Sequence, residues 1–415
     1  MNKQHHVIIG GSAAGVSAAL AMRNHGFDGR ITLIDAGSEV PYERPPLSKS
    51  TDLNTVHPIA PDSMYVENDI ELLLGHSVIA VESDQTVILD SGERLHADAL
   101  LLATGGTPRK LGVPGEDLDN VLMLRDIDDA RAFAPRLKTE GPFVIIGGGF
   151  IGLEAAAVAR EKDMDVTVVE AMPIPLAGVL GTKLATVVRD IHANAGVRIL
   201  TGRVATEFKG SGAVEQVVLD DGTTIAAATV LVGVGVIPND ALARGVGVHC
   251  DNGIVVDDYG QTNVPWIWAA GDVANFFSPF TGRRQRIEHW DVAQRHGAAV
   301  GASMAGVFTA NTAAPYFWSE QYGLRLQMYG RAKPGDELVL RLGESTNQMI
   351  AFWVNDSVLS AAAALDSPGE LRAAKVLIEE RIPVDVAELT DPGVSLKSLA
   401  RQRSRNAGLA PSITT

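Results

Sequence analysis

Cysteine is almost absent from this sequence: the 415-residue chain contains a single one, Cys250. Thiol–disulfide exchange within one chain needs a pair of cysteines, so this chain cannot pass electrons through a redox disulfide of its own. A lone cysteine is typical of a reducing compartment, and it most often behaves as a small buried apolar residue. The sequence therefore excludes a disulfide reductase.

Long hydrophobic runs are also missing. No apolar stretch approaches the ~18 residues that a membrane-spanning helix requires. The first predicted strand begins at Val7, which leaves no room for a signal peptide before it. Together these absences predict a cytoplasmic protein.

Positive charge is scarce, since the formal net charge is −15 at pH 7. This balance argues against a nucleic-acid-binding protein, which normally carries a basic excess. The ten histidines show no spacing with cysteine or carboxylates that would build a metal site, so no metal is predicted. The composition is otherwise that of a globular protein, 46% apolar and 20% charged, and the chain is long enough for two or three domains.

Two glycine-rich loops stand out, at 7–15 and 144–152. Each follows a short apolar strand and opens an alanine-rich helical stretch, the context in which such a loop binds a dinucleotide. Two such sites in one chain predict a flavoprotein that binds FAD and takes hydride from a nicotinamide. The predicted strand–helix–strand repeats cover 7–9, 13–25 and 31–35 in the first half, and 143–147, 150–162 and 165–170 in the second.

The first loop departs from the G-x-G-x-x-G pattern, because Ser12 stands at the middle glycine between Gly10 and Gly15. Serine is small, so we expect pyrophosphate binding to survive, with the helix N-terminus supplying free N–H groups and the positive end of its dipole. Asp35 ends the second strand, where an acidic side chain binds ribose hydroxyls. This half is predicted to hold FAD.

The second loop is complete, with Gly147, Gly149 and Gly152. Glu170 ends its second strand and would accept from both hydroxyls of the adenine ribose. A carboxylate there repels a 2′-phosphate, and the following segment 171–173 offers no arginine to bind one. The second half is therefore predicted to prefer NADH over NADPH.

A proline-stiffened loop, 41–49, follows the first repeat and carries Arg44 and Lys49. Its place just beyond the FAD strand lets both cations reach the cofactor, where a positive charge would stabilise the negative charge that develops on reduction. We expect Glu154, just past the second loop, to hold Lys49 in position.

The rest of the sequence predicts an α/β fold of three domains, with the second inserted into the first. The other predicted strands lie near 72–82, 86–90, 98–103, within 197–236, and at 321–329, 336–342, 348–354 and 358–364, and further helices lie at 291–305 and 369–381.

Several motifs in this order resemble the oxygenase-coupled NADH-dependent ferredoxin reductase family: Pro-Pro-Leu-Ser-Lys at 45–49, Ala-Thr-Gly at 103–105, the second glycine loop, Ala-Gly-Asp at 270–272, and Phe-Trp-Ser-Glu-Gln-Tyr at 317–322. The resemblance spans about Val7 to Leu396. It implies a glutathione-reductase-like fold with two Rossmann-like domains. The implied boundaries are 1–112 and 241–318 for the FAD domain, 113–240 for the inserted NADH domain, and 319–415 for a C-terminal α+β domain.

The resemblance also implies site residues. Catalytic roles fall on Lys49, Glu154, Trp290 and Trp318, although core packing is an alternative for the two tryptophans. Besides the first loop, FAD contacts fall on Ala14, Asp35, Arg44, Lys49, Val78, Ala103, Thr104, Gly105, Arg125, Asp272 and Trp290. NADH contacts fall on Gly147, Gly149, Phe150, Ile151, Gly152, Glu170, Gly235 and Glu288.

The implied activity is an NADH:ferredoxin reductase that delivers electrons one at a time to a [2Fe–2S] ferredoxin, which supplies a P450 or a ring-hydroxylating oxygenase. The basic cluster Arg283, Arg284 and Arg286 is predicted to form the docking patch, with a solvated loop as its alternative. A rubredoxin reductase on the same fold stays open. An NADH oxidase is disfavoured because no redox cysteine lies in 46–49, and an apoptosis-inducing-factor-like switch is disfavoured because long insertions are absent.

Overall fold

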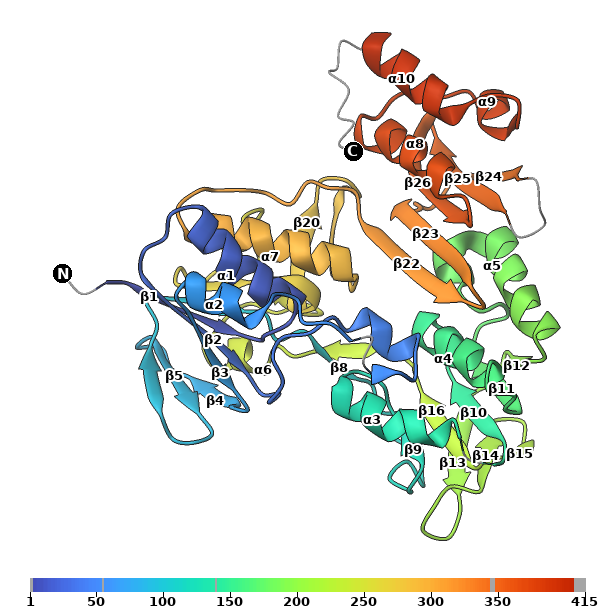
Figure 1. The fold of residues 1–415 in the computed structure, drawn as a ribbon, viewed down its shortest axis with the longest axis horizontal. Helices are drawn as coiled ribbons and strands as arrows, with labels where there is room; N and C mark the ends of the chain where they lie inside the picture. Colours follow the sequence, from blue (N-terminus) through green and yellow to red (C-terminus); the bar gives the residue numbers. More distant parts are fainter. Residues whose placement is uncertain (1–2, 54–55, 139, 344–347, 407–415) are drawn as a thin grey trace. The chain divides into compact units, whose positions relative to one another are not determined.

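The computed structural model describes residues 3–53, 56–138, 140–343 and 348–406. The chain divides into two compact units (Figure 1). The first comprises Met1–Glu43, Val56–Thr107 and Val236–Pro315; the second comprises Arg44–Thr55, Pro108–Gly235 and Tyr316–Thr415. The three-domain boundaries stay a prediction, and their outer limits fall on terminal residues outside the described ranges.

A five-stranded parallel sheet organises the first unit, in the order β19-β7-β1-β2-β3. Its strands are nearly continuous apolar runs because both faces are buried, as parallel sheets require. The strands are β1 (His5–Ile9), β2 (Arg30–Asp35), β3 (Ile70–Leu74), β7 (Ala99–Leu102) and β19 (Ile267–Ala269). A three-stranded antiparallel sheet, β4 (Val78–Val81), β5 (Thr86–Leu89) and β6 (Arg94–His96), precedes β7.

Helices α1 (Ala13–Asn24) and α7 (Trp290–Met304) lie side by side in this unit (Figure 1). Their contact is backbone to backbone: a Cβ at Gly297 would lie 2.2 Å from the Ala14 carbonyl oxygen, and one at Gly301 would lie 2.3 Å from that of Ala18. Small residues at helical spacing therefore fix the position of α1, whose first turn follows the first glycine loop.

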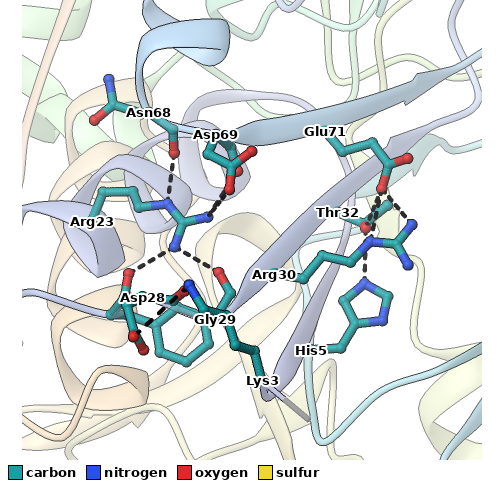
Figure 2. Close-up of polar contacts among 11 residues, drawn as sticks. Lys3, His5, Arg23, Asp28, Gly29, Arg30, Thr32, Asn68, Asp69 and Glu71 are labelled. Atoms are coloured by element: carbon teal, nitrogen blue, oxygen red, sulfur yellow. Dashed lines mark hydrogen bonds and ion pairs between the residues drawn. The ribbon is translucent and has the colours of Figure 1, made fainter.

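An arginine clamp holds the end of α1 (Figure 2). The Arg23 guanidinium donates to the carbonyl oxygens of Phe27 and Gly29 at 2.7 Å each, to that of Asn68 at 2.6 Å and to that of Asp69 at 2.7 Å. The same figure shows Glu71 accepting from Thr32 and Arg30 across β2 and β3. The Arg23 bonds therefore tie the turn after α1 to the turn that precedes β3.

The second unit repeats the plan with a parallel sheet in the order β12-β11-β10-β16-β9. As in the first unit, a three-stranded antiparallel sheet comes in the chain just before one strand of the parallel sheet. The predicted α/β fold with two Rossmann-like units is confirmed. The elements are β9 (Val121–Leu122), α3 (Ile127–Arg136), β10 (Phe143–Ile146), α4 (Phe150–Arg160), β11 (Val166–Glu170), α5 (Ala177–Asn194), β12 (Arg198–Thr201), β13 (Ala205–Lys209), β14 (Gln216–Leu219), β15 (Thr224–Ala226) and β16 (Thr229–Val232).

The same unit contains an antiparallel sheet near the C-terminus, ordered β22-β23-β26-β25-β24. The predicted strand 321–329 is wrong, because the chain turns at Tyr322 and Gly323, whose φ angles are 53° and 71°. The elements are β22 (Tyr316–Gln321), β23 (Leu324–Gly330), β24 (Glu337–Leu342), β25 (Met349–Asn355), β26 (Val358–Leu365), α8 (Pro368–Glu379), α9 (Val386–Thr390) and α10 (Leu396–Asn406).

The predicted strand 72–82 is also two strands, because the chain turns at Gly75 (φ 73°) between β3 and β4. The remaining elements are short: the 3-10 helices η1 (Pro45–Ser48) and η3 (Gly271–Val273), α2 (Asp62–Glu67), β8 (Gly106–Pro108), β17 (Val236–Pro238), α6 (Ala241–Gly245), β18 (Ile254–Val255), β20 (Ala274–Ser278) and β21 (Arg283–Gln285).

None of the helices in the described ranges is long and apolar enough to cross a membrane. Over the same ranges, no group of three or more histidine, cysteine, aspartate or glutamate side chains is arranged to hold a metal ion.

Candidate functional site

The first glycine loop joins β1 to α1 and is held by two close backbone contacts. Gly10 has a φ of +112°, and a Cβ there would lie 2.2 Å from the Ala103 carbonyl oxygen. A Cβ at Gly15 would lie 2.0 Å from the carbonyl oxygen of Gly10. Only glycine fits at either position, because each contact is with backbone that cannot move aside.

The second loop, between β10 and α4, repeats this geometry. Gly147 has a φ of +105°, and its Cβ would lie 2.4 Å from the Gly233 carbonyl oxygen. A Cβ at Gly152 would lie 2.2 Å from the carbonyl oxygen of Gly147. Ala103, which closes the first loop, begins the predicted contact segment Ala103–Gly105. Gly233, which closes the second, lies two residues before the predicted contact Gly235.

The middle position of the second loop is different, because a side chain there would meet open space. A Cβ at Gly149 would have no atom of the described chain within 4 Å. Ser12 stands at the corresponding position, which explains why the first loop tolerates a serine. It is also where G-x-G-x-x-G loops let a pyrophosphate approach the backbone.

Both following helices leave their first N–H groups for an anion. Ser12 is the N-cap of α1 and Gly149 that of α4, and within the described chain neither makes a side-chain cap. The nearby helix α3 contrasts with them, since Asp126 and Asp129 form a full capping box at its start. Uncapped N-termini behind an open loop position fit the phosphates of a dinucleotide.

The two acidic residues at the strand ends also lie alike. Asp35 accepts the N–H of Gly11 at 2.5 Å and that of Gly37 at 2.8 Å. Glu170 accepts the N–H of Gly148 at 2.7 Å and that of Met172 at 2.6 Å. Each carboxylate is therefore fixed beside its loop, where the adenine ribose of a dinucleotide would lie.

The surroundings of Glu170 bear on the choice between NADH and NADPH. Arg203 lies next to Glu170 in the structure: its main-chain N–H donates to the Glu170 carbonyl oxygen at 3.1 Å. Its guanidinium, however, forms an ion pair with Asp221 at 2.7 Å. The charge of Arg203 is thus already balanced, which agrees with the predicted discrimination against a 2′-phosphate.

Asp272 lies in η3, next to the start of α1. A Cβ at Gly271 would lie 2.7 Å from the Ala14 Cβ, so the Ala-Gly-Asp turn approaches the first loop closely. The Gly271 N–H donates to Nδ1 of the buried His296 at 3.3 Å. Burial lowers the pKa of His296 to about 4, which keeps Nδ1 available as an acceptor.

The predicted pairing of Lys49 with Glu154 is present: Lys49 Nζ lies 3.0 Å from Glu154 Oε2. The Glu154 side chain is only 3% exposed, and two serine hydroxyls also donate to it. Ser48 donates to Oε2, and Ser319 of β22 donates to Oε1 at 2.6 Å. The whole cluster lies within the second unit, and every carboxylate oxygen in it has a donor, as a buried charge requires.

Sequence reasoning missed the continuation of this cluster. Gln321 Nε2 donates to Ser319 Oγ at 2.9 Å, and Gln321 Oε1 lies 2.6 Å from Nε2 of the buried His192. Tyr322 OH lies 3.1 Å from Nδ1 of His192. The available signal was the alternation of Ser319 and Gln321 along β22, which puts two polar side chains on the strand's buried face.

The other predicted residues are distributed between the units. Trp290 begins α7, Val78 begins β4, and Thr104 donates from Oγ1 to the Asn239 carbonyl oxygen at 2.7 Å; all three belong to the first unit. Trp318 of β22 stacks on Tyr316 with ring centroids 6.0 Å apart. The remaining predicted residues in the second unit are Arg44, Arg125, Phe150, Ile151 and Gly235.

The predicted arginine patch is smaller than the sequence suggested. Arg286 forms an ion pair with Glu288 at 2.8 Å and donates to the Asp272 carbonyl oxygen at 2.9 Å, and its side chain is 9% exposed. Including it in an exposed patch was wrong, because it braces the turn that carries Asp272. Arg284 is exposed but donates to the carbonyl oxygens of Val256 and Asn275. Arg283, on the same strand β21, is exposed as well.

Cys250 is half-buried, and burial raises the pKa of its thiol. Its Sγ lies 3.5 Å from the Val248 carbonyl oxygen. A thiol with a raised pKa holds little thiolate and is a poor nucleophile, so Cys250 fits a structural residue.

Comparisons with known proteins agree with this geometry. The family model for pyridine nucleotide-disulphide oxidoreductases matches residues 4–297, and a reductase C-terminal model matches residues 316–400. The chain is 37% identical over 401 residues to the ferredoxin reductase component of chlorobenzene dioxygenase from Cupriavidus sp. (strain PS12), covering 96% of this chain and 98% of that protein. It is 35% identical to putidaredoxin reductase from Pseudomonas putida, covering 95% and 96%. Among solved structures, the covalent putidaredoxin reductase–putidaredoxin complex matches with a TM-score of 0.93 and 33% identity, covering 97% of this chain and 100% of the matched chain.

Proposed function

Because the chain belongs to the pyridine nucleotide-disulphide oxidoreductase family, we propose that it is an FAD-dependent NADH:ferredoxin reductase. It passes electrons one at a time to a [2Fe–2S] ferredoxin that supplies a P450 or a ring-hydroxylating oxygenase. The observation that carries the proposal is the near-full-length similarity to ferredoxin reductase components in a chain whose single cysteine leaves no disulfide outlet.

FAD and NADH fit the two duplicated loops. When bound, they supply the redox chemistry: hydride leaves the nicotinamide for the flavin, and the flavin gives up electrons singly. In the first unit, Gly10, Ser12, Asp35 and Asp272 would hold FAD, because the open loop position, the uncapped helix and the fixed carboxylate match a pyrophosphate and a ribose. The second loop and Glu170 would hold NADH in the same way.

Lys49 and Glu154 carry the charge that the reaction needs. We assign Lys49 the role of a fixed cation beside the flavin, where it favours the reduced, negatively charged form. Glu154 keeps that ammonium in one place through the 3.0 Å ion pair. Replacement of Lys49 with Met should slow flavin reduction by roughly 10²-fold, the size expected for loss of one preorganised electrostatic contact.

For the ferredoxin, we propose a docking patch on β21 centred on Arg283. Arg283 is exposed and donates to the Gln285 side chain at 3.2 Å, whereas the guanidiniums of Arg284 and Arg286 donate to main-chain carbonyl oxygens. Charge reversal by Arg283→Glu should lower the rate of ferredoxin reduction and weaken its dependence on salt, because exposed charges steer encounter more than they hold the complex. An unchanged salt dependence would remove this patch from the proposal.

Stopped-flow kinetics test the activity as a whole. The FAD-loaded protein is mixed anaerobically with NADH, and cytochrome c reduction is then followed with and without putidaredoxin. Fast flavin bleaching followed by putidaredoxin-dependent cytochrome c reduction is the expected result. In a separate aerobic run, fast oxygen uptake without a carrier would instead indicate an NADH oxidase, and preferential reduction of rubredoxin would move the assignment to a rubredoxin reductase.

We also propose a cytoplasmic location, which the single cysteine supports because reducing compartments keep such thiols free. Recovery of the flavoprotein in the periplasmic or membrane fraction after cell fractionation would contradict it.

A further inference from the structure

A chain of hydrogen bonds runs through the second unit and ends at Glu154. It passes from Tyr322 to His192 (3.1 Å), from His192 to Gln321 (2.6 Å), from Gln321 to Ser319 (2.9 Å), and from Ser319 to Glu154 (2.6 Å). Three parts of the chain contribute to it: α4 supplies Glu154, α5 supplies His192, and the β22–β23 hairpin supplies the other three side chains.

The direction of every bond follows from its chemistry. Ionised Glu154 only accepts, so the Ser319 hydroxyl donates to it and must itself accept from the Gln321 amide nitrogen. The Gln321 oxygen then faces His192 and accepts from the Nε2–H group of the neutral ring. This leaves Nδ1 as an acceptor for the Tyr322 hydroxyl. All four donors therefore point toward the carboxylate, an arrangement in which each bond strengthens the next.

Burial fixes the direction of these hydrogen bonds. Ser319 and the His192 ring are both 0% exposed, and Gln321 is buried beside them. Desolvation lowers the pKa of His192, which keeps the ring neutral and leaves one nitrogen as donor and the other as acceptor. A buried amide or hydroxyl without a partner would be costly, so no member of the chain can turn away without a penalty.

We propose that Gln321 and His192 are positioning residues for the Lys49–Glu154 ion pair, acting through Ser319. They orient the Ser319 hydroxyl so that it donates to Glu154 Oε1. The carboxylate then cannot rotate, and its Oε2 stays directed at the Lys49 ammonium. This inference rests on the proposed function in one respect, that Lys49 acts beside the flavin. The hydrogen-bond chain itself depends only on residues of the second unit.

The test uses the full-length FAD-loaded protein and two readouts. The first is the rate at which acetic anhydride acetylates Lys49, followed by mass spectrometry as a function of pH. The second is the rate of flavin reduction by NADH. In Ser319→Ala, Lys49 should acetylate about tenfold faster and the flavin should reduce about tenfold more slowly, as expected for loss of one hydrogen bond to a charged group. Gln321→Leu frees the Ser319 hydroxyl to turn away and should change both rates in the same directions. The KM for NADH should stay unchanged.

Matched variants separate positioning from general damage. Ser360→Ala is the control, because Ser360 is also a buried serine of the C-terminal sheet that donates to a carboxylate, that of Asp336. It should leave Lys49 acetylation and flavin reduction unchanged. Ser319→Thr keeps the hydroxyl and should restore both values. If Ser319→Ala fails to fold, Gln321→Leu and His192→Phe carry the test.

Two outcomes distinguish the failure of this inference from that of the proposed function. Wild-type acetylation and reduction rates in Ser319→Ala and Gln321→Leu, combined with slow reduction in Lys49→Met, would overturn the positioning role alone. Unchanged flavin reduction in Lys49→Met would instead overturn the assigned role of Lys49, while faster acetylation in Gln321→Leu would still support the hydrogen-bond chain.

Discussion

Arg23 in the first nucleotide-binding half and Arg160 in the second stand at the same place after their glycine loops and make the same contacts. The Nη1 group of Arg23 donates to the Phe27 carbonyl oxygen, and that of Arg160 donates to the corresponding oxygen of Met164. With the loop contacts and the fixed carboxylates, this clamp shows that the two halves share one framework down to single hydrogen bonds. We propose that this framework is the part that binds a dinucleotide.

The halves differ at one position, two residues after the last glycine of each loop. In α4 this position holds the buried Glu154, whereas in α1 it holds the half-buried Ser17. A buried carboxylate needs partners, and Lys49, Ser48 and Ser319 supply them in the second unit. The two halves share the proposed cofactor-binding framework, and the added charge cluster distinguishes the second half.

The largest expected effect comes from replacing one loop glycine in each half, which tests the shared framework. Gly10→Ala and Gly147→Ala both place a Cβ against a carbonyl oxygen at a positive φ, which should cost about 4 kcal/mol from strain and overpacking together. Gly10→Ala should lose FAD, whereas Gly147→Ala should keep FAD and lose NADH binding. FAD content and the KM for NADH measure the two effects. Loss of FAD in both variants would show that the halves do not function separately.

Acid should destabilise the first unit more than the second, in which burial also lowers the pKa of one histidine, His192. In the first unit, burial lowers the pKa values of His6 and His296 to about 4, below the unfolded value of 6.5. The unfolded state therefore binds more protons, so the contribution to stability is complete above pH 6.5 and is lost as the pH falls toward 4. At pH 5 each histidine should cost about 2 kcal/mol.

Urea unfolding followed by FAD fluorescence between pH 7 and pH 5 measures this loss. His296→Gln should flatten the pH dependence, because the glutamine cannot take up a proton. An equally steep dependence in that variant would rule out His296 as a source.

A smaller effect should distinguish the two acidic residues. Glu170→Ala should reduce the preference for NADH over NADPH by about 10- to 100-fold, since it removes a repulsive charge and leaves two N–H groups without their acceptor. Asp35→Ala should weaken FAD retention without changing nucleotide preference. The ratio of kcat/KM for the two nucleotides is the measurement, and an unchanged ratio in Glu170→Ala would refute the role of that residue.

The smallest effect should come from exchanging the middle residues of the loops. Ser12→Gly and Gly149→Ser each replace the middle residue of one loop. Because a Cβ at Gly149 meets open space, each replacement should change the free energy of unfolding by less than about 0.5 kcal/mol. Thermal unfolding measures the change. A larger loss in Gly149→Ser would show that the second loop is less tolerant than the first.

The repeated framework could be predicted from the sequence because its signals are local: apolar strands, glycines at fixed spacing and an acidic residue at the strand end. The β22–β23 turn could not, since Tyr322 adopts a positive φ without being a usual turn residue. The long helix α5, with Gly181 at a φ of 67°, was not predicted either. The hydrogen-bond chain to Glu154 was missed because its members come from three segments that only tertiary structure brings together.

The contact between α1 and α7 also sets an order of events during synthesis. Residues 13–24 emerge early from the ribosome, yet the Gly297 and Gly301 backbone on which they pack emerges only after most of the chain is made. Strand β19 completes the first sheet equally late. The intervening nucleotide fold, from β10 to β16, has all of its strands by residue 232. Of the two nucleotide folds, the one that begins first is therefore finished last. Its apolar strands stay uncovered for longer during synthesis, and exposed apolar strands favour aggregation.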